Sequence, residues 1–244
     1  MTRQYRFLEQ VPQLAQREVR VHFLPLGDSS YREELASLLS SDERDRADRF
    51  YFSPDCARFT TTRAALRLLL GRYLSASPQE IRFAYSGYGK PRLSEDVGVQ
   101  FNVSHTKDMA MFAFTRIGEV GIDVERHRQV KMLDGMAERC LAAAQYEQFS
   151  SLGDEAKKSA FFRFWTRKEA VIKAVGLGLS QPLKDFDVSF LEGEEASLLR
   201  AEWDFGDVTE WSLHELEVSP EHQAAVAIRN RDVSVICSHH ESLF

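Results

Sequence analysis

Three acidic residues in two short segments could together bind a divalent metal ion. Asp123 and Glu125 lie two residues apart in a predicted strand, so their side chains point to the same side. Glu169 lies on the apolar face of a predicted helix, where a carboxylate is costly without a cation. Three carboxylates, water and a substrate phosphate would suit Mg²⁺. Two plainer interpretations stay open: a strand with a polar outer face, and a salt bridge from Glu169 to Lys173 one turn later.

Small polar and basic residues elsewhere in the chain could bind a phosphate. Ser104 and His105 end a predicted strand with a hydroxyl and a ring N–H, although local hydrogen bonds that close a turn would also explain them. Lys90 follows a flexible glycine and could reach an anion. Arg46 and Arg58 belong to a basic and acidic run that is by default a solvated helix face, from which an arginine could turn inward.

No protein nucleophile stands out in the sequence. It contains no GxSxG elbow, no phosphate-binding P-loop and no zinc-type spacing of Cys and His. An enzyme with metal ligands and phosphate ligands but no nucleophile is expected to bring two substrates together, with the attacking group on the second substrate.

The elements that must position these residues follow the same order twice along the chain. Apolar spacing predicts two long helices, over residues 54–73 and 154–175. Strands are predicted at 19–24, 81–85, 99–104, 110–115, 120–125, 186–190, 211–218 and 224–228. The repeated order of helix, glycine-containing loop and strands predicts two similar α+β lobes joined near residues 116–119.

The composition is ordinary for a globular protein and favours a small-molecule partner. A formal net charge of −6 argues against nucleic acid as the main partner. No apolar run approaches the roughly 20 residues of a membrane helix, and residues 1–6 lack the apolar core of a secretory signal. Three scattered cysteines indicate a reducing compartment. We therefore expect a cytoplasmic protein with no membrane partner.

Five segments in order resemble the 4′-phosphopantetheinyl transferases, specifically the larger, pseudo-dimeric Sfp-type branch. The resemblance covers about residues 40–183. It is carried by YGKP at 88–91, FNVSH at 101–105, GIDVE at 121–125, FWTRKEA at 164–170, and KA at 173–174 followed by GLGL at 176–179.

The resemblance implies a fold, an activity and a set of ligands. The implied fold is α+β, with two similar lobes related by a pseudo-two-fold, each a long helix packed on a small antiparallel sheet. Residues 1–116 would form the lobe with coenzyme A phosphate contacts, and residues 117–244 the lobe with the metal ligands. The implied reaction moves the phosphopantetheine arm of coenzyme A to a serine of a carrier protein and releases adenosine 3′,5′-bisphosphate.

Site residues carry over from the family position by position. Asp123, Glu125 and Glu169 would bind Mg²⁺, which also holds the pyrophosphate of coenzyme A. The residues that would contact the phosphates of coenzyme A are Arg46, Arg58, Lys90, Ser104, His105 and Lys173. Glu169 is the first candidate for the base that accepts the serine proton, and a route through Asp123 or water is the second. Lys173 would neutralise charge in the transition state.

Three departures from the family pattern qualify these expectations. Gln145 stands where many relatives carry a glutamate, with Glu147 two residues on. Cys140 and Leu141 stand where aromatic residues are usual, which would alter carrier docking. A frequent lysine is replaced by Glu43, so the grip on the 3′-phosphate would rest on Arg44 or Arg46.

The expected partners are coenzyme A and apo carrier proteins of the fatty-acid, polyketide or peptide-synthetase type. Residues 130–136 carry apolar side chains at helical spacing and would either dock a carrier helix or pack in the core. An internal pseudo-dimer needs no second copy, so a monomer is expected. Two alternatives stay open: a Mg²⁺-dependent hydrolase of a nucleotide or coenzyme A pyrophosphate, and a binding module without turnover.

Overall fold

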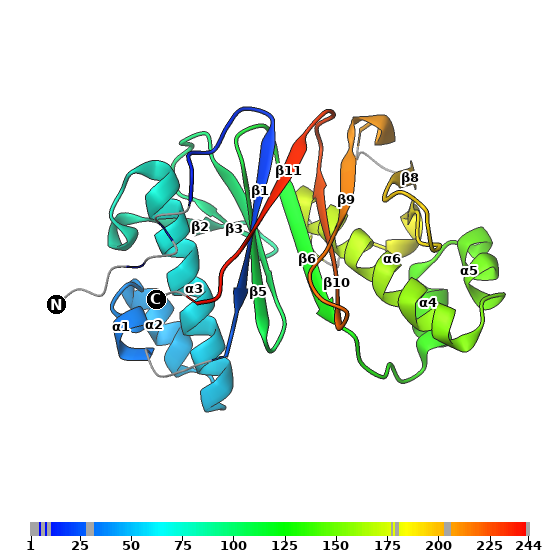
Figure 1. The fold of residues 1–244 in the computed structure, drawn as a ribbon, viewed down its shortest axis with the longest axis horizontal. Coiled ribbons are helices and arrows are strands. Elements are labelled where there is room, and N and C mark those ends of the chain that lie inside the picture. Colours follow the sequence, from blue (N-terminus) through cyan, green and yellow to red (C-terminus); the bar gives the residue numbers. More distant parts are fainter. Residues whose placement is uncertain are drawn as a thin grey trace.

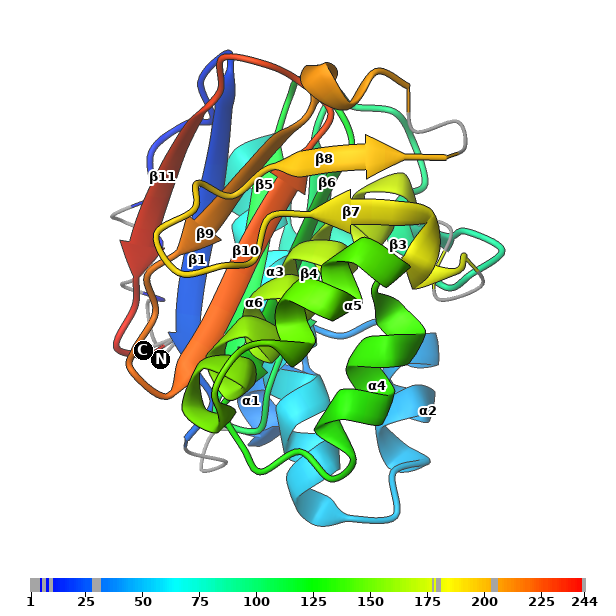
Figure 2. The same ribbon diagram turned by 90° about the vertical axis from the view of Figure 1, so that its right-hand side faces the viewer.

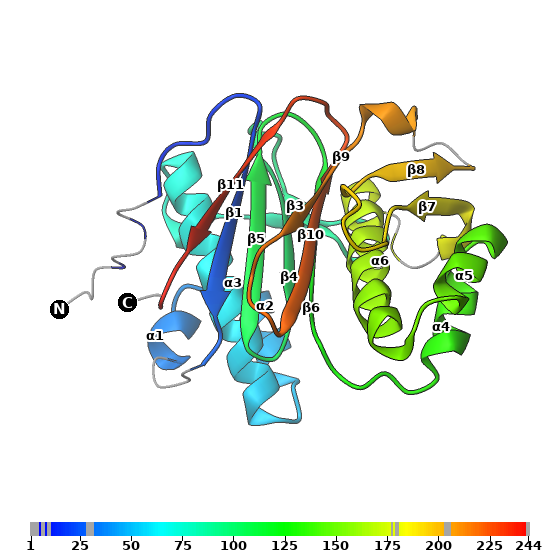
Figure 3. The ribbon, with the colours of Figure 1, turned by 45° about the vertical axis from the view of Figure 1, so that its right-hand side comes forward.

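The chain folds into four layers, with a long helix on each outer face and two sheets between them (Figures 1 and 3). The computed structural model describes residues 5, 8, 11–27, 32–176, 178, 181–202 and 206–242. The two sheets face each other through apolar side chains that alternate along their strands. Val21 and Phe23 of one sheet share this central core with Ile122 and Val124 of the other.

The first sheet has the strand order β11-β1-β5-β4. Its strands are β1 (Glu18–Pro25), β4 (Gln100–His105), β5 (Met109–Thr115) and β11 (Ser234–His239). Strand β5 pairs antiparallel with both β1 and β4, whereas β11 pairs parallel with β1. The predicted antiparallel sheet therefore gains a parallel edge strand from the opposite end of the sequence, which the sequence analysis did not predict.

Helix α3 (Ser53–Leu74) covers the outer face of this sheet across a layer of large side chains. It begins with a proline in its first turn and ends at Ser75, which adopts the left-handed conformation with φ of 52°. Leu69 and Tyr73 of the helix pack in one core with Phe112 and Phe114 of β5. Smaller elements complete the lobe: α1 (Arg32–Ala36), α2 (Ser41–Asp48), the 3₁₀ turn η2 (Pro78–Glu80), β2 (Phe83–Tyr85) and β3 (Pro91–Leu93).

The second sheet has the order β6-β10-β9 and is antiparallel throughout. Its strands are β6 (Val120–Arg126), β9 (Ser212–Leu216) and β10 (His222–Ile228). Helix α6 (Asp154–Val175) covers its outer face and ends at Gly176, whose φ is 80°. The predicted bounds of this helix, residues 154–175, are confirmed.

The remaining elements lie on the outer side of α6 (Figure 2). They are α4 (Leu133–Cys140), α5 (Ala143–Ser150), η4 (Leu183–Asp185), β7 (Phe186–Val188), β8 (Leu198–Ala201) and η5 (Val208–Glu210). Strands β7 and β8 pair antiparallel and share a core with α4, α5 and α6.

The predicted fold class is confirmed, because each lobe has one 22-residue helix packed on a small sheet. The proposed division at residues 116 and 117 stays a prediction, and β11 crosses it by completing the first sheet. Within the described residues, no helix is both long and apolar enough to span a membrane.

Candidate functional site

Strand β6 carries Asp123 between the second sheet and helix α6. Ile122 and Val124 face the central core, so Asp123 points to the helix side, where it is only 4% exposed. Gly121 on the same side allows the helix backbone to come close. A Cβ at Gly121 would lie 2.0 Å from the carbonyl oxygen of Ala170 and 2.2 Å from the amide nitrogen of Ala174. Helix α6 therefore packs directly against β6, which brings its polar side chains within reach of Asp123.

Asp123, Ser104 and Lys173 form a closed triangle of hydrogen bonds. The Nζ of Lys173 lies 2.6 Å from Oδ1 of Asp123 and donates to the Oγ of Ser104 at 3.0 Å. The Ser104 hydroxyl donates to the same Asp123 oxygen at 3.0 Å. Each residue comes from a different element, β6, β4 and α6, so this triangle joins the two lobes.

Strand β4 supports β6 through polar side chains on alternate residues. Oδ1 of Asn102 accepts the amide of Ile122 at 3.0 Å, and Oγ of Ser104 accepts the amide of Val124 at 3.3 Å. These bonds satisfy β6 amides that would otherwise be buried without a partner. The plainer interpretation, a turn closed by local hydrogen bonds, is wrong for Asn102 and Ser104, because both bind a strand about 20 residues away.

Glu169 and Glu125 lie near Asp123 and feel its charge. Burial first, and then the negative charge of Asp123, raise the pKa of Glu169 to about 7. The same two causes raise the pKa of Glu125. The predicted salt bridge between Glu169 and Lys173 is not formed, since the lysine pairs with Asp123. The Oε1 atom of Glu169 is instead buried without a hydrogen-bond partner.

The three acids fit a cation chemically without being arranged around one. Both Oδ2 of Asp123 and Oε1 of Glu169 are buried oxygens without a partner, as expected where a cation belongs. Across the part of the chain that the structure describes, however, no three acidic, His or Cys side chains stand in positions that could hold a metal ion. The ammonium of Lys173 explains part of this result, because it bonds to Oδ1 of Asp123, an oxygen that a metal ion could otherwise use.

Two of the predicted phosphate ligands lie close to this triangle. His105 ends β4 at an exposed rim, yet desolvation and then the positive charges of Lys173 and Arg58 lower its pKa. Arg58 pairs with Asp55 and lines a hollow of about 290 Å³ together with Lys107. His105, Arg58 and Lys173 thus form a basic edge beside Asp123.

Lys90 and Arg46 have other partners. The Nζ of Lys90 donates to the carbonyl of Ala174 at 2.9 Å and to that of Val120 at 3.3 Å, and burial lowers its pKa to about 8. These two carbonyls accept two of the three N–H groups of the Lys90 ammonium. The predicted role of Lys90 as a phosphate ligand therefore depends on the third N–H alone. Arg46 is exposed on α2, with its guanidinium 5.2 Å from the ring centre of Phe59.

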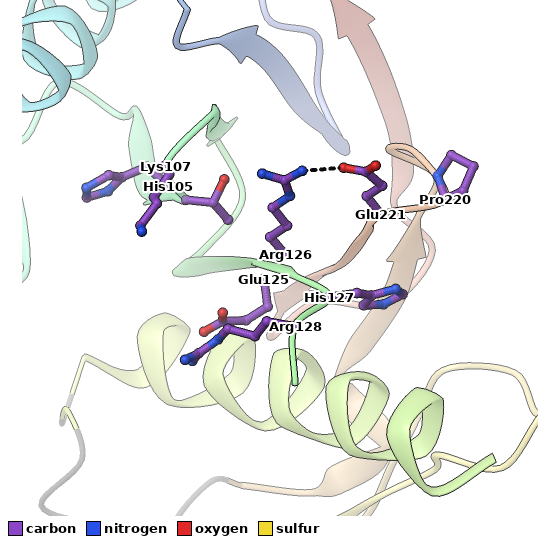
Figure 4. A pocket seen from close by; sticks show the side chains of 9 residues that line it. His105, Lys107, Glu125, Arg126, His127, Arg128, Pro220 and Glu221 are labelled. Atoms are coloured by element: carbon purple, nitrogen blue, oxygen red, sulfur yellow. Dashed lines mark hydrogen bonds and ion pairs between the residues drawn. The ribbon is translucent and has the colours of Figure 1, made fainter. Parts of the chain in front are cut away.

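A cleft of about 710 Å³ opens beside Glu125 at the junction of the lobes (Figure 4). Figure 4 shows Glu125 next to Arg128, with His105 and Lys107 across the opening. The β9–β10 turn forms the far wall and is tied to β6 by an ion pair of 2.6 Å between Arg126 and Glu221. The residues that line the cleft are His105, Thr106, Lys107, Glu125, Arg126, His127, Arg128, Pro220 and Glu221.

A second hollow of about 370 Å³ shares Glu125 and Arg128 with the first and is more apolar. Its walls include Val130, Met136, Phe161, Phe162 and Trp165. Residues 130–136 include both packed and exposed side chains, and the docking of a carrier helix there stays a prediction. The Met132 side chain is 80% exposed, whereas Met136 packs against the second core.

The structure gives two of the departures from the family pattern a structural explanation. Glu43 is buried and pairs with Arg67 at 2.6 Å, so it stabilises the first lobe and offers nothing to an anion. Gln145 is also buried and donates to the carbonyl of Val188 at 2.8 Å, whereas Glu147 is exposed on α5.

Cys140 and Leu141, the third departure, are buried in the core of the second lobe. Their side chains therefore offer no carrier surface. An altered carrier surface would have to come from exposed residues such as Met132.

The sequence did not indicate how Gly121 and Asn102 bring the site together. Gly121 belongs to a motif, but the close approach of a helix leaves no periodic signal. Asn102 stands two residues before Ser104, and this spacing was the available sign that both side chains serve the same neighbouring strand.

Comparisons with known proteins show the family of this chain. The family model "4'-phosphopantetheinyl transferase superfamily" matches residues 119–228, and the model "4'-phosphopantetheinyl transferase, N-terminal" matches residues 28–116. The 4'-phosphopantetheinyl transferase HetI of Nostoc sp. is 38% identical over 231 residues, covering 92% of this chain and 94% of that protein.

Two Bacillus proteins are similar over shorter stretches. The 4'-phosphopantetheinyl transferase psf-1 of Bacillus pumilus is 31% identical, covering 73% of this chain and 76% of that protein. The 4'-phosphopantetheinyl transferase Sfp of Bacillus subtilis is 28% identical, covering 68% of this chain and 73% of that protein. The resemblance inferred from five short segments is thereby confirmed, and the chain belongs to the 4′-phosphopantetheinyl transferase superfamily.

Proposed function

We propose that the protein transfers the 4′-phosphopantetheine group of coenzyme A to a serine of an apo carrier protein. The products are the holo carrier protein and adenosine 3′,5′-bisphosphate. One observation supports this most strongly: buried acids and a basic edge meet at a cleft between two lobes, in a chain 38% identical to a named transferase over nearly its full length.

The reaction needs charge neutralisation and a proton acceptor. The serine oxygen attacks the β-phosphoryl group, the bond to the bridging oxygen breaks, and adenosine 3′,5′-bisphosphate leaves with the electron pair. Lys173 and His105, which lines the cleft, would bind phosphate oxygens, and Arg58 lies near enough for its charge to act on His105. The carbonyl-bound Lys90 and exposed Arg46 are weaker candidates.

Glu169 is the first candidate to accept the serine proton. Its pKa, raised to about 7, suits a base that works near neutral pH. Asp123 or a water molecule is the second candidate.

Asp123, Glu125 and Glu169 would hold Mg²⁺ in this proposal. The support is the donor set itself, which includes the unpartnered Oδ2 of Asp123 and Oε1 of Glu169. Bound Mg²⁺ would supply charge neutralisation for the pyrophosphate of coenzyme A.

The carrier protein would approach beside Glu125, where the second hollow and the exposed Met132 lie. Fatty-acid, polyketide and peptide-synthetase carriers are the proposed classes. We propose that the protein works as a monomer, since its own two lobes provide every residue of the proposed site. We also propose that it works in the cytoplasm.

Incubation with coenzyme A, Mg²⁺ and a panel of apo carriers tests the proposal. The expected result is a mass gain of one phosphopantetheine on a carrier, and none when the acceptor serine is replaced by alanine. Release of phosphopantetheine without any carrier would indicate a hydrolase. Coenzyme A binding by the folded protein with no modification of any carrier would indicate a binding module.

A further inference from the structure

We propose that Lys173 is a placeholder cation, whose ammonium neutralises Asp123 until a divalent metal ion binds and then turns outward to the phosphates. This inference rests on the proposed function and adds to it how the buried carboxylate of Asp123 is stabilised before a metal ion binds. It assigns Lys173 two positions, one in the resting protein and one in the loaded protein.

The contacts of Asp123 show why the resting protein needs such a cation. The carboxylate is 4% exposed, and a buried carboxylate without a cationic partner is strongly destabilising. Lys173 lies 2.6 Å from Oδ1 and Ser104 lies 3.0 Å from it, so this oxygen is fully satisfied. The other oxygen, Oδ2, has no partner. Only one of the two carboxylate oxygens of Asp123 therefore has a partner.

The same lysine explains why the acids do not stand ready for a metal ion. Glu169 is close enough to Asp123 and Lys173 for both charges to shift its pKa, yet its Oε1 has no partner. A divalent ion that takes Asp123 and Glu169 as ligands would face the ammonium at Asp123 Oδ1. Two cations that share one carboxylate oxygen repel each other strongly at such distances.

Lys173 has the freedom to leave. Its side chain is 29% exposed, compared with 6% for the side chain of Asp123, so part of its long stem lies at the surface. His105 lies near enough for the Lys173 charge to lower its pKa. An outward turn of the ammonium would therefore keep it at the basic edge, where a phosphate would replace Asp123 as its partner.

Lys168 is the natural comparison on the same helix. Its ammonium is buried, donates to the backbone carbonyls of Leu183 and Phe186, and lies 4.5 Å from the ring centre of Phe186. None of these partners is a carboxylate of the site, so Lys168 should stay in place whether or not a metal ion is bound.

Reductive methylation followed by peptide mass spectrometry tests the two positions of Lys173 in the wild-type protein. The labelling rate of Lys173 should rise about fivefold or more when Mn²⁺ saturates the protein, since the ammonium loses its carboxylate partner. The labelling rate of Lys168 should stay constant. An unchanged rate for Lys173 at saturating Mn²⁺ overturns the proposal.

Metal affinity without nucleotide gives an independent test. We expect Lys173→Met to bind Mn²⁺ at least about tenfold more tightly than the wild type, a change of about 1.4 kcal/mol. Arg128→Met is the matched control, because it removes one exposed positive charge next to Glu125 and should change the affinity by less than about twofold. Equal tightening in both variants would mean general electrostatics and overturn the placeholder role.

The outcome separates this inference from the proposed function. Phosphopantetheine transfer by a wild-type protein in which Lys173 does not respond to Mn²⁺ would overturn only the placeholder. Failure of Mn²⁺ and Mg²⁺ to bind in any variant would overturn both the placeholder and the metal site, whereas the transfer assay with carriers decides the activity by itself.

Discussion

Each lobe has a buried cationic side chain at the same position of its long helix. Arg67 and Lys168 are each the fifteenth residue of α3 and α6, respectively. Arg67 donates to the carbonyls of Pro78 and Ile81 in the segment that follows its helix. Lys168 does the same with two carbonyls after α6. This shared contact supports an internal duplication better than the loose sequence match, because position and bonding pattern both agree.

The lobes differ in how closely the helix approaches the sheet. In the first lobe, His22 of β1 points toward α3 and bonds to the hydroxyl of Tyr73 at 2.6 Å, within a layer that also holds Phe114. In the second lobe, Asp123 of β6 points toward α6 and pairs with Lys173. The first contact joins neutral groups in an aromatic layer, and the second joins charged groups where Gly121 admits the helix backbone.

Under the proposed function, this difference explains why the proposed metal ligands all come from the second lobe. The neutral pair of His22 and Tyr73 lies among aromatic rings, where it stabilises the packing and leaves no oxygen for an ion to bind. A charged pair beside a cleft keeps unpartnered oxygens that a cation can use. Under the proposed function, the same scaffold stabilises packing in one lobe and would bind a cation in the other.

The largest expected effect separates Asp123 from its counterpart His22. Asp123→Asn should lower kcat/KM for transfer by about 10³-fold, equivalent to about 4 kcal/mol, since it removes a proposed ligand of the Mg²⁺ that would neutralise charge in the transition state. His22→Asn should leave transfer per folded molecule unchanged. Steady-state transfer assays, corrected for the folded fraction by circular dichroism, check both. Equal losses in the two variants would end the functional distinction between the lobes.

The next largest effect is an acid sensitivity of the first lobe. Burial lowers the pKa of His22 to about 3, so the unfolded chain takes up a proton below pH 6.5 that the folded chain refuses. The stability contribution is therefore complete above pH 6.5 and is lost as the pH falls, by about 3 kcal/mol between pH 7 and pH 4.

Urea unfolding at pH 7, 5.5 and 4 measures this effect. The fall in unfolding free energy should be about 3 kcal/mol smaller in His22→Gln than in the wild type. Parallel curves for the two proteins would mean that His22 is not the responsible group.

A somewhat smaller effect tests the close approach of α6. Gly121→Ala places a methyl group against the helix backbone and should cost about 2–3 kcal/mol of stability, because backbone cannot yield as a side chain does. Transfer should also fall, because the displaced helix carries Glu169 and Lys173 away from Asp123. Gly153→Ala at the start of α6 is the control, since a Cβ there meets nothing within 4 Å. Thermal melts that show the same loss for both variants would contradict the close approach.

The smallest effect tests the shared cation. Lys168→Met should cost about 2 kcal/mol, since it leaves two buried carbonyls without a donor. Arg67→Met should cost at least as much, because it also removes the 2.6 Å partner of the buried Glu43 carboxylate. Chemical denaturation of the two variants provides the comparison. A cost confined to one variant would show that the lobes share geometry without sharing energetics.

Local signals explain what the sequence could predict about the fold. Helix α6 was predicted at its observed bounds because its apolar spacing is regular and Gly176 ends it at positive φ. Strand β6 was predicted from its alternation. Strand β11 was missed, because its pairing partner β1 lies more than 200 residues away and its six residues alternate only weakly.

The candidate site divides in the same way. The three acids could be picked out because a carboxylate on an apolar face, or a pair of carboxylates two residues apart, is unusual by itself. The partner of Lys173 could not be identified, since spacing along the helix favours Glu169 whereas the fold supplies Asp123 from a strand 50 residues away. Spacing along the sequence indicates which residues are neighbours within one helix or strand, but it does not indicate contacts between different elements.

The parallel pairing of β11 with β1 has a consequence for synthesis on the ribosome. Residues 18–25 emerge early, yet the strand that covers their outer edge is made of residues 234–239. The amino-terminal lobe therefore leaves the exit tunnel with an open strand edge, which is a site for mispairing between nascent chains. Completion of that lobe has to wait until residues 234–239 have been translated.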